Sequence, residues 1–125
     1  QGNMETIPDS TSVQKAAQRM KEKKIGSLLV TQNGEITSIV TEEIFTRKVL
    51  GDKLNPETTL VSELMENPTT IKADQPMDSA LSSMHENDAR YLAVIEDNKI
   101  TGIISLKDLT IYYKNKFITA QDIDE

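Results

Sequence analysis

The sequence contains no cysteine and no tryptophan, and its single histidine is His85. Without cysteine the chain cannot form disulfides, use a thiol nucleophile or hold a metal through thiolates. One histidine cannot supply a His-rich zinc site. These absences exclude several classes of catalytic and metal centre. The lack of disulfides also predicts a reducing, cytoplasmic setting.

Long apolar runs and excess positive charge are missing as well. No apolar run approaches the roughly 20 residues that span a bilayer, so no membrane partner is expected. The net charge of −6 argues against nucleic acid as a partner, because that binding depends on neutralising phosphates. One basic cluster reads either as a solvated helix face or as a nucleic-acid contact; it comprises Lys15, Arg19, Lys21, Lys23 and Lys24.

What the sequence does contain is an internal repeat. Sliding the chain by 64 positions lays Thr6–Phe45 on Thr70–Leu109 without a gap, with ten of the forty positions identical. Both copies carry apolar residues at i, i+3, i+4 and i+7, which is typical of an amphipathic helix facing a core. These residues are Val13, Ala16, Ala17 and Met20 in the first copy and Met77, Ala80, Leu81 and Met84 in the second. Thr11 with Gln14 resembles a capping box, and Pro76 suits a first helical turn.

Two short β-rich runs follow each predicted helix. They cover Ser27–Thr31 and Ile36–Val40 in the first copy, and Tyr91–Ile95 and Ile100–Ile104 in the second. Between the runs, Asn33-Gly34 and Asp97-Asn98 tolerate the positive φ angles of a tight hairpin turn. An additional edge strand is expected before each helix, at Glu5–Ile7 and Thr69–Lys72.

A closing helix is expected after each hairpin. Thr41 and Ser105 are good N-cap residues. The first closing helix is predicted to end near Leu50 with Gly51 as its C′ residue, and the second to cover about Leu106–Lys116. Each copy therefore reads as a βαββα repeat, too small to cover its own sheet alone.

The gap-free duplication, the element order and the ending GIISLKDL at residues 102–109 resemble a tandem pair of CBS (cystathionine-β-synthase-type) domains, also called a Bateman module. The resemblance covers about residues 5–117, and residues 54–71 resemble the family's linker, with a short helix at 61–65. It implies an α+β fold of two βαββα repeats packed about a pseudo-two-fold axis. Repeat 1 is assigned to residues 1–60, with Gln1 and Gly2 read as a tag remnant, and repeat 2 to residues 61–125.

The resemblance also implies a function. Family pairs commonly hold an adenosine derivative (AMP, ADP, ATP or S-adenosylmethionine) in the cleft between repeats, need no further cofactor and associate as homodimers. It implies a fused or separate effector domain or enzyme as partner. No equivalent of the linker helix precedes the first copy, so the chain is expected to be a fragment or the fused part of a longer protein.

Asp108 is the leading candidate for a ligand contact. An ionised carboxylate can accept hydrogen bonds from both vicinal ribose hydroxyls, and such charge-assisted bonds contribute roughly 1.5–3 kcal/mol each. The resemblance places Asp108 at the ribose, while Ser105 at the helix start can donate to ribose or phosphate, with Lys107 nearby. The same Ser-x-x-Asp spacing also reads as a helix-capping pair that needs no ligand, and both readings stay open.

Three further site residues come from the resemblance alone. In the family, a basic residue at the place of Arg90 faces the ligand phosphates, which suits a planar guanidinium. Arg90 reads equally well as a surface arginine. Thr70 and Ile71 match the segment where backbone groups read the adenine edge and an aliphatic side chain covers its face.

The first copy lacks two of these groups. Ile44 stands at the position that matches Asp108, and Gly26 at the position that matches Arg90, whereas Thr41 keeps the hydroxyl. Glu43 should not substitute, because one helical position turns a side chain by about 100°. The sequence therefore predicts one competent nucleotide site per chain.

Two classes of function follow. The first is a regulatory sensor that binds an adenosine nucleotide, and the alternative is a structural dimerisation module without a physiological ligand. The sequence shows no nucleophile–base pair, metal cluster or phosphate-cradling glycine loop, so an enzyme is not expected.

Overall fold

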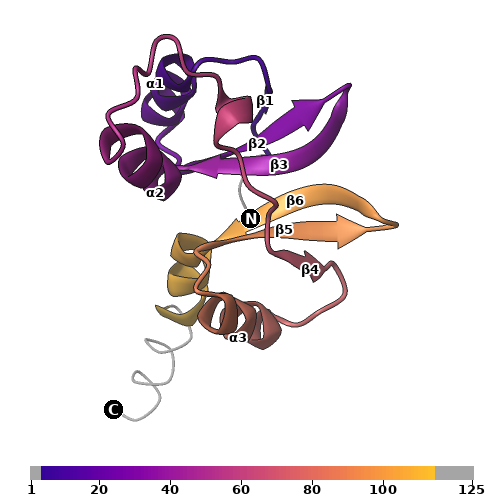
Figure 1. Ribbon diagram of the computed structural model, residues 1–125. Coiled ribbons are helices and arrows are strands. Elements are labelled where there is room, and N and C mark those ends of the chain that lie inside the picture. Colours follow the sequence, from indigo (N-terminus) through magenta and orange to yellow (C-terminus); the bar gives the residue numbers. More distant parts are fainter. Residues whose placement is uncertain (1–3, 115–125) are drawn as a thin grey trace. The chain divides into compact units, whose positions relative to one another are not determined.

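A computed structural model describes residues 4–114, and the chain divides into two compact units (Figure 1). The first unit spans Met4–Pro68, and the second begins at Thr69. Within each unit the elements follow in the order strand, helix, strand, strand, helix. The predicted βαββα repeat and the mixed α+β class are confirmed.

The first unit contains a three-stranded sheet in the order β1-β2-β3. Its elements are β1 (Thr6–Pro8), α1 (Val13–Lys23), β2 (Ser27–Gln32), β3 (Glu35–Thr41), α2 (Glu42–Ile44), the π-helix η1 (Phe45–Leu50) and the 3₁₀-helix η2 (Val61–Glu63). β1 pairs with β2 in parallel, and β2 with β3 antiparallel.

The second unit repeats this sheet in the order β4-β5-β6. Its elements are β4 (Thr70–Lys72), α3 (Met77–Asn87), β5 (Tyr91–Glu96), β6 (Lys99–Ser105) and a closing helix at residues 106–114. The predicted end of that helix, Lys116, lies outside the described residues.

The repeat holds at the level of single residue pairs. Thr6 pairs with Leu29, and the residues 64 positions later pair in the same way. The hairpin register shifts after Val30, and it shifts again after Val94. Such a match in bulge position means that the two copies share their strand geometry as well as their element order.

The hairpin turns form as the sequence predicts. Asn33 and Gly34 have φ angles of 53° and 82°, and Asp97 and Asn98 have φ angles of 54° and 63°. Two consecutive positive φ angles are the signature of a type I′ turn, whose twist matches that of the flanking strands.

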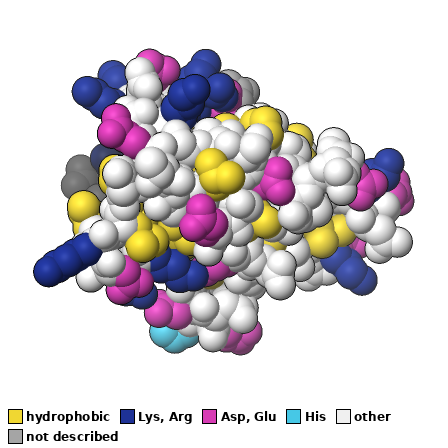
Figure 2. Space-filling model, turned by 45° about the horizontal axis from the view of Figure 1, so that its top comes forward, with side chains coloured by type: hydrophobic (Ala, Val, Ile, Leu, Met, Phe, Trp, Pro, Cys, Tyr) yellow, Lys and Arg dark blue, Asp and Glu magenta, His cyan; other side chains and the backbone are white. Residues whose placement is uncertain are grey.

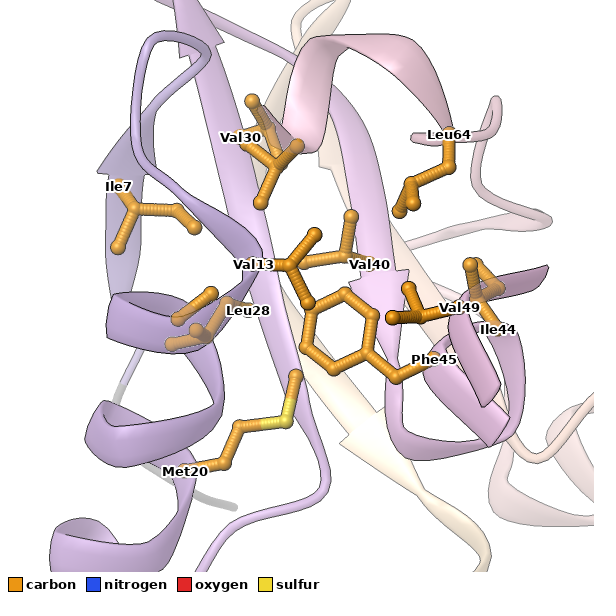
Figure 3. Packing of buried hydrophobic residues seen from close by; sticks show 12 residues of the cluster. Ile7, Val13, Met20, Leu28, Val30, Val40, Ile44, Phe45, Val49 and Leu64 are labelled. Carbon is orange, nitrogen blue, oxygen red and sulfur yellow. The ribbon is translucent and has the colours of Figure 1, made fainter. Parts of the chain in front are cut away.

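The first unit buries its core between the sheet and the helices (Figure 3). Val13 and Met20 of α1 are buried there, and Met84 is buried in the second unit, as predicted, whereas Met77 is half-buried. Ala17 is exposed and Leu81 is 40% exposed, so the predicted stripe was too wide by one position in both copies. The i+4 position lies at the edge of the face defined by i, i+3 and i+7.

Two predicted helix boundaries need correction. α1 is capped by Ser12, whose hydroxyl accepts the Lys15 N–H at 3.1 Å, so the predicted capping box at Thr11 was wrong by one residue. Gly51 has an ordinary φ of −62°, so it is not a left-handed C′ residue. A Cβ at position 51 would collide with the carbonyl oxygen of Arg47, and glycine is needed there for that close approach.

The linker packs on the first unit. Val61 and Leu64 are buried in the first core. Glu66 pairs with Ile39 of β3 through two backbone hydrogen bonds of 2.9 and 3.0 Å, and its carboxylate lies 3.1 Å from Lys48 Nζ. The compact first unit therefore includes the linker helix.

Candidate functional site

Four of the predicted site residues lie at one end of the second sheet. Because β4 and β5 are parallel and β6 is antiparallel to them, the starts of β4 and β5 meet the end of β6. Thr70 begins β4, Arg90 precedes β5 and Ser105 ends β6, where Asp108 follows in the next turn. The Leu106 N–H donates to the Arg90 carbonyl at 2.7 Å, which ties the closing helix to the start of β5.

Ser105 and Asp108 form a reciprocal capping box. The Asp108 N–H donates to Ser105 Oγ at 3.0 Å, and the Ser105 N–H donates to Asp108 Oδ2 at 2.9 Å. Both residues are half-buried. The prediction of a capping pair from the Ser-x-x-Asp spacing is thus confirmed. Asp108 occupies the position that Glu occupies in many capping boxes.

The capping box leaves part of the Asp108 carboxylate available. Of the two carboxylate oxygens only Oδ2 accepts a hydrogen bond, and no residue from 4 to 114 donates to Oδ1. Holding one oxygen on a backbone N–H also fixes the orientation of the other oxygen. The carboxylate can therefore cap the helix and accept from a ligand at the same time.

The other predicted residues differ in exposure. Arg90 and Lys107 are exposed, and neither forms an ion pair with any residue that the structure describes. Thr70 is exposed at the start of β4. Ile71 is half-buried and packs against the core of the second unit, so its side chain faces the helices.

Tyr91 also lies at this end of the sheet, and its sequence position predicts only that it belongs to a strand. It lies directly opposite Ser105 in the β5–β6 register and is half-buried. Its counterpart in the first copy is Ser27, so this replacement of a small residue by an aromatic one was the available signal. An aromatic ring next to the capping box offers a flat apolar surface.

The first unit keeps the backbone frame but not the acid. Thr41 Oγ1 accepts the Ile44 N–H at 3.1 Å, and the Gly26 carbonyl accepts the Glu42 N–H at 3.0 Å. Ile44 is only 7% exposed and packs in the first core with Phe45. The position that presents a carboxylate in the second unit therefore serves packing in the first.

Tyr113 and Asp78 form a second polar contact in the second unit. The Tyr113 hydroxyl donates to Asp78 Oδ1 and ties the closing helix to α3. This hydrogen bond, then desolvation and the negative charge of Asp78, raise the pKa of Tyr113 to about 12. The contact steadies the helix that carries Asp108.

The basic cluster lies along α1 and at its C-cap, Lys24. Arg19 pairs with Glu5 at 3.4 Å, and the four lysines of the cluster are exposed. On the face visible in Figure 2, Asp and Glu side chains lie among the Lys and Arg side chains. Within residues 4–114 there is no group of three potential metal-ligating side chains, and no helix there is long and apolar enough to cross a membrane.

Sequence comparison matches residues 2–51 and 61–115 to the CBS domain. The CBS domain-containing protein CBSCBSPB3 of Arabidopsis thaliana is 34% identical over 103 residues, which cover 81% of this chain and 18% of that protein. CBSCBSPB5 of the same plant is 32% identical, with coverage of 81% and 19%. The chain thus spans about a fifth of the length of these curated relatives.

Solved structures share the fold. A protein with CBS domains from Burkholderia ambifaria superposes with a TM-score of 0.82 at 33% identity, covering 86% of this chain and 80% of its own. A CBS domain protein from Pyrobaculum aerophilum, solved in complex with AMP, gives a TM-score of 0.76 at 18% identity, with coverage of 86% and 84%. At that identity the likeness concerns the fold alone.

Proposed function

Because the chain belongs to the CBS-domain family, we propose that it is a regulatory module that binds an adenosine nucleotide at one site per chain, built around Asp108 of the second unit. The observation that carries the proposal is the half-buried carboxylate of Asp108, oriented by the Ser105 N–H and with Oδ1 open. Such preorganisation lowers the entropy lost when a ligand binds.

The ribose is the part of the ligand that this carboxylate suits. Two vicinal hydroxyls can donate to one ionised carboxylate, and such bonds are roughly twice as strong as neutral ones. Ser105 Oγ, which already accepts the Asp108 N–H, can donate its own proton to a ribose or phosphate oxygen. In this proposal the Ser105–Asp108 pair caps the helix and also binds the ribose.

Arg90 and Lys107 supply positive charge for the phosphates. Both are exposed cations that form no ion pair within residues 4–114. Arg90 precedes β5, next to the turn that holds Asp108, because its carbonyl accepts the Leu106 N–H. Thr70 and Tyr91, at the same end of the sheet, are proposed to contact the adenine. Ile71 belongs to this set only through its backbone, since its side chain packs inward.

The regulatory output follows from differential affinity. A nucleotide can shift an equilibrium between two states of the module only if it binds one state more tightly. The effector, a fused domain or a separate enzyme, would respond to that shift. The AMP complex of the Pyrobaculum protein supports adenosine nucleotides as the first class to test.

A thermal-shift panel tests the proposal. Adenosine, AMP, ADP, ATP and S-adenosylmethionine are compared with the guanine nucleotides GMP and GTP. A ligand at 100 times its dissociation constant should add about 2.7 kcal/mol to stability. Arg90→Ala should reduce the shift caused by ATP more than that caused by adenosine. If no adenosine compound shifts the melting temperature of the wild type, the proposed function is wrong.

A specific observation favours a second candidate, a homodimerisation module. Leu81 of α3 is 40% exposed and Ile111 of the closing helix is 52% exposed, whereas their first-copy counterparts are Ala17 and Arg47. Exposed apolar helix faces of this kind often mark association surfaces. Light scattering should then give twice the chain mass of 14.0 kDa, and Ile111→Glu should give the monomer. A monomeric wild type would remove this candidate.

A further inference from the structure

The helices α1 and α3 occupy matching positions in the two units but carry opposite charge. From Val13 to its C-cap Lys24, α1 carries the five cations of the basic cluster and a single acid, which gives a net charge of +4. The matching segment of α3, from Met77 to its C-cap Asp88, carries three acids and no lysine or arginine, which gives a net charge of −3 with its histidine neutral. The acidic cluster comprises Asp78, Glu86 and Asp88.

Neither cluster is neutralised within its own unit. The four lysines of the basic cluster are exposed and form no ion pair with any residue from 4 to 114, whereas Arg19 pairs with Glu5 at 3.4 Å. The acidic cluster is exposed as well, and no lysine or arginine in the same range forms an ion pair with it. The net charge of −6 disfavours a long polyanion such as nucleic acid as the partner of the basic cluster. A compact acidic surface fits better, and a second copy of the chain carries one on α3.

The sizes of the side chains on the two helices are also complementary. Ala17 of α1 and Leu81 of α3 occupy the same position of the repeat, and both are exposed, Leu81 at 40%. A leucine that projects from one helix can pack against a small residue on another, because the two helices approach there without a clash. If the helices cross antiparallel at this contact, Lys21, four residues after Ala17, lies beside Asp78, three residues before Leu81. The same approach buries the leucine and pairs opposite charges.

We propose that the chain forms an antiparallel homodimer in which α1 of each copy docks on α3 of the other, with the basic cluster against the acidic cluster. Two-fold symmetry makes this contact twice, because each copy offers the surface that the other copy requires. The proposal rests on the homodimerisation candidate of the previous subsection and adds to it the surfaces and their orientation.

Charge selects this arrangement over a parallel one. In a parallel dimer α1 would face α1 and α3 would face α3, which opposes two basic clusters at one contact and two acidic clusters at the other. Like charges that face each other across an interface are unfavourable, whereas exposed pairs of opposite charge add little affinity. The charges therefore set the orientation, and buried apolar side chains such as Leu81 supply most of the affinity.

Disulfide cross-linking tests the orientation, because the chain has no cysteine of its own. Chains with Ala17→Cys and with Leu81→Cys are oxidised separately and as a mixture. A disulfide requires Cα atoms within roughly 4.4–6.8 Å of each other. Covalent dimer should therefore form in the mixture and be nearly absent with either chain alone. Ala17→Cys mixed with Thr101→Cys, an exposed position on β6, gives the background from random collision.

An exchange of charges tests the same contact with Leu81 intact. One chain carries Lys21→Glu and Lys24→Asp, and a second chain carries Glu86→Lys and Asp88→Lys. Lys24 and Asp88 both have a positive φ, so each position accepts the residue of the other. Light scattering, at a concentration where the wild type is partly dissociated, should show each of these chains shifted towards monomer. A chain with all four changes should dimerise like the wild type, because its clusters are again of opposite sign.

Three results would overturn the proposal. Covalent dimer from Ala17→Cys alone would show that α1 faces α1, so the homodimer would stand with the parallel orientation. Wild-type dimerisation of both charge-changed chains would show that the two clusters do not meet. A monomeric wild type would remove the homodimer and this contact together. All of these measurements are made without nucleotide, so none of them bears on the proposed nucleotide site.

Discussion

At the scale of single residues, Asp108 takes the capping role that the sequence predicts, and its geometry is compatible with the ligand contact proposed as the alternative. Its carboxylate closes a capping box with Ser105 through Oδ2, and Oδ1 stays open to a ligand. The Ser-x-x-Asp spacing alone predicts a helix cap or a ribose contact. It cannot show that one carboxylate could do both, because that depends on which oxygen accepts the Ser105 N–H. The loss of the acid at Ile44 likewise follows from packing, since that side chain lies in the first core.

Asp108→Asn separates the two roles. The amide oxygen of Asn can still accept the Ser105 N–H, so apo stability should fall by only a few tenths of a kcal/mol to about 1 kcal/mol. Loss of the charge should weaken nucleotide binding by roughly 1.5–3 kcal/mol, or about ten- to a hundredfold. Urea unfolding and calorimetric titration measure the two quantities. An unchanged affinity together with a lower melting temperature would leave Asp108 with the capping role only.

The sequence indicates that Gly51 ends a helix, but it does not show that glycine is needed there because of the nearby Arg47 carbonyl. Gly→Ala usually stabilises by ~0.4–1 kcal/mol where the backbone conformation is ordinary, as the φ of −62° is here. The collision of a Cβ with the Arg47 carbonyl should reverse the sign, so Gly51→Ala should destabilise by roughly 1–3 kcal/mol, the usual range for overpacking. Urea unfolding measures this change, and a stabilised variant would contradict the steric account.

At the scale of elements, the strands, turns and helices of each repeat were predictable, whereas the π-helical form of the first closing helix was not. The short β-rich runs and their Asn-Gly and Asp-Asn turns carry strong local signals, and the strands formed within one residue of the predicted bounds. The π-helical stretch Phe45–Leu50 depends on hydrogen bonds such as Gly51 N–H to the Thr46 carbonyl. A shift from i−4 to i−5 bonding leaves almost no trace in an apolar pattern.

The contact between α3 and the second closing helix should respond to alkaline pH. Because the pKa of Tyr113 is raised from 10.0 to about 12 by its hydrogen bond to Asp78, the folded state holds this proton more tightly than the unfolded state. The stabilising effect of the Tyr113–Asp78 hydrogen bond is therefore complete below pH 10 and is lost as the pH rises from about 10 to 12.

Wild type and Tyr113→Phe provide the comparison. Their difference in unfolding free energy should stay constant from pH 8 to about 10 and shrink above it. Asp78→Ala should abolish this pH dependence, since it removes both the hydrogen bond and the negative charge that raise the pKa of Tyr113. A difference that stays constant through pH 11 would show that the Tyr113 hydroxyl and Asp78 do not interact in solution.

At the scale of the whole molecule, the chain is a duplication whose two copies share their element order and differ in the residues at one end of the sheet. Both keep the same strand register and the same hydroxyl cap at the start of the closing helix. Only the second copy combines a half-buried carboxylate, Asp108, with an exposed arginine, Arg90, that forms no ion pair within residues 4–114, at the same end of its sheet. The duplication and the missing groups were visible in the sequence, whereas the covering of only the first unit by the linker was not, because it depends on tertiary packing.

The most direct test of the central claim is the stoichiometry of nucleotide binding. Isothermal titration calorimetry of the wild-type chain uses the adenosine compound that gives the largest thermal shift. The account predicts about one site per chain, because Ile44 and Gly26 leave the first copy without the acid and the base. Two equivalent sites per chain, or no binding heat at all, would contradict it.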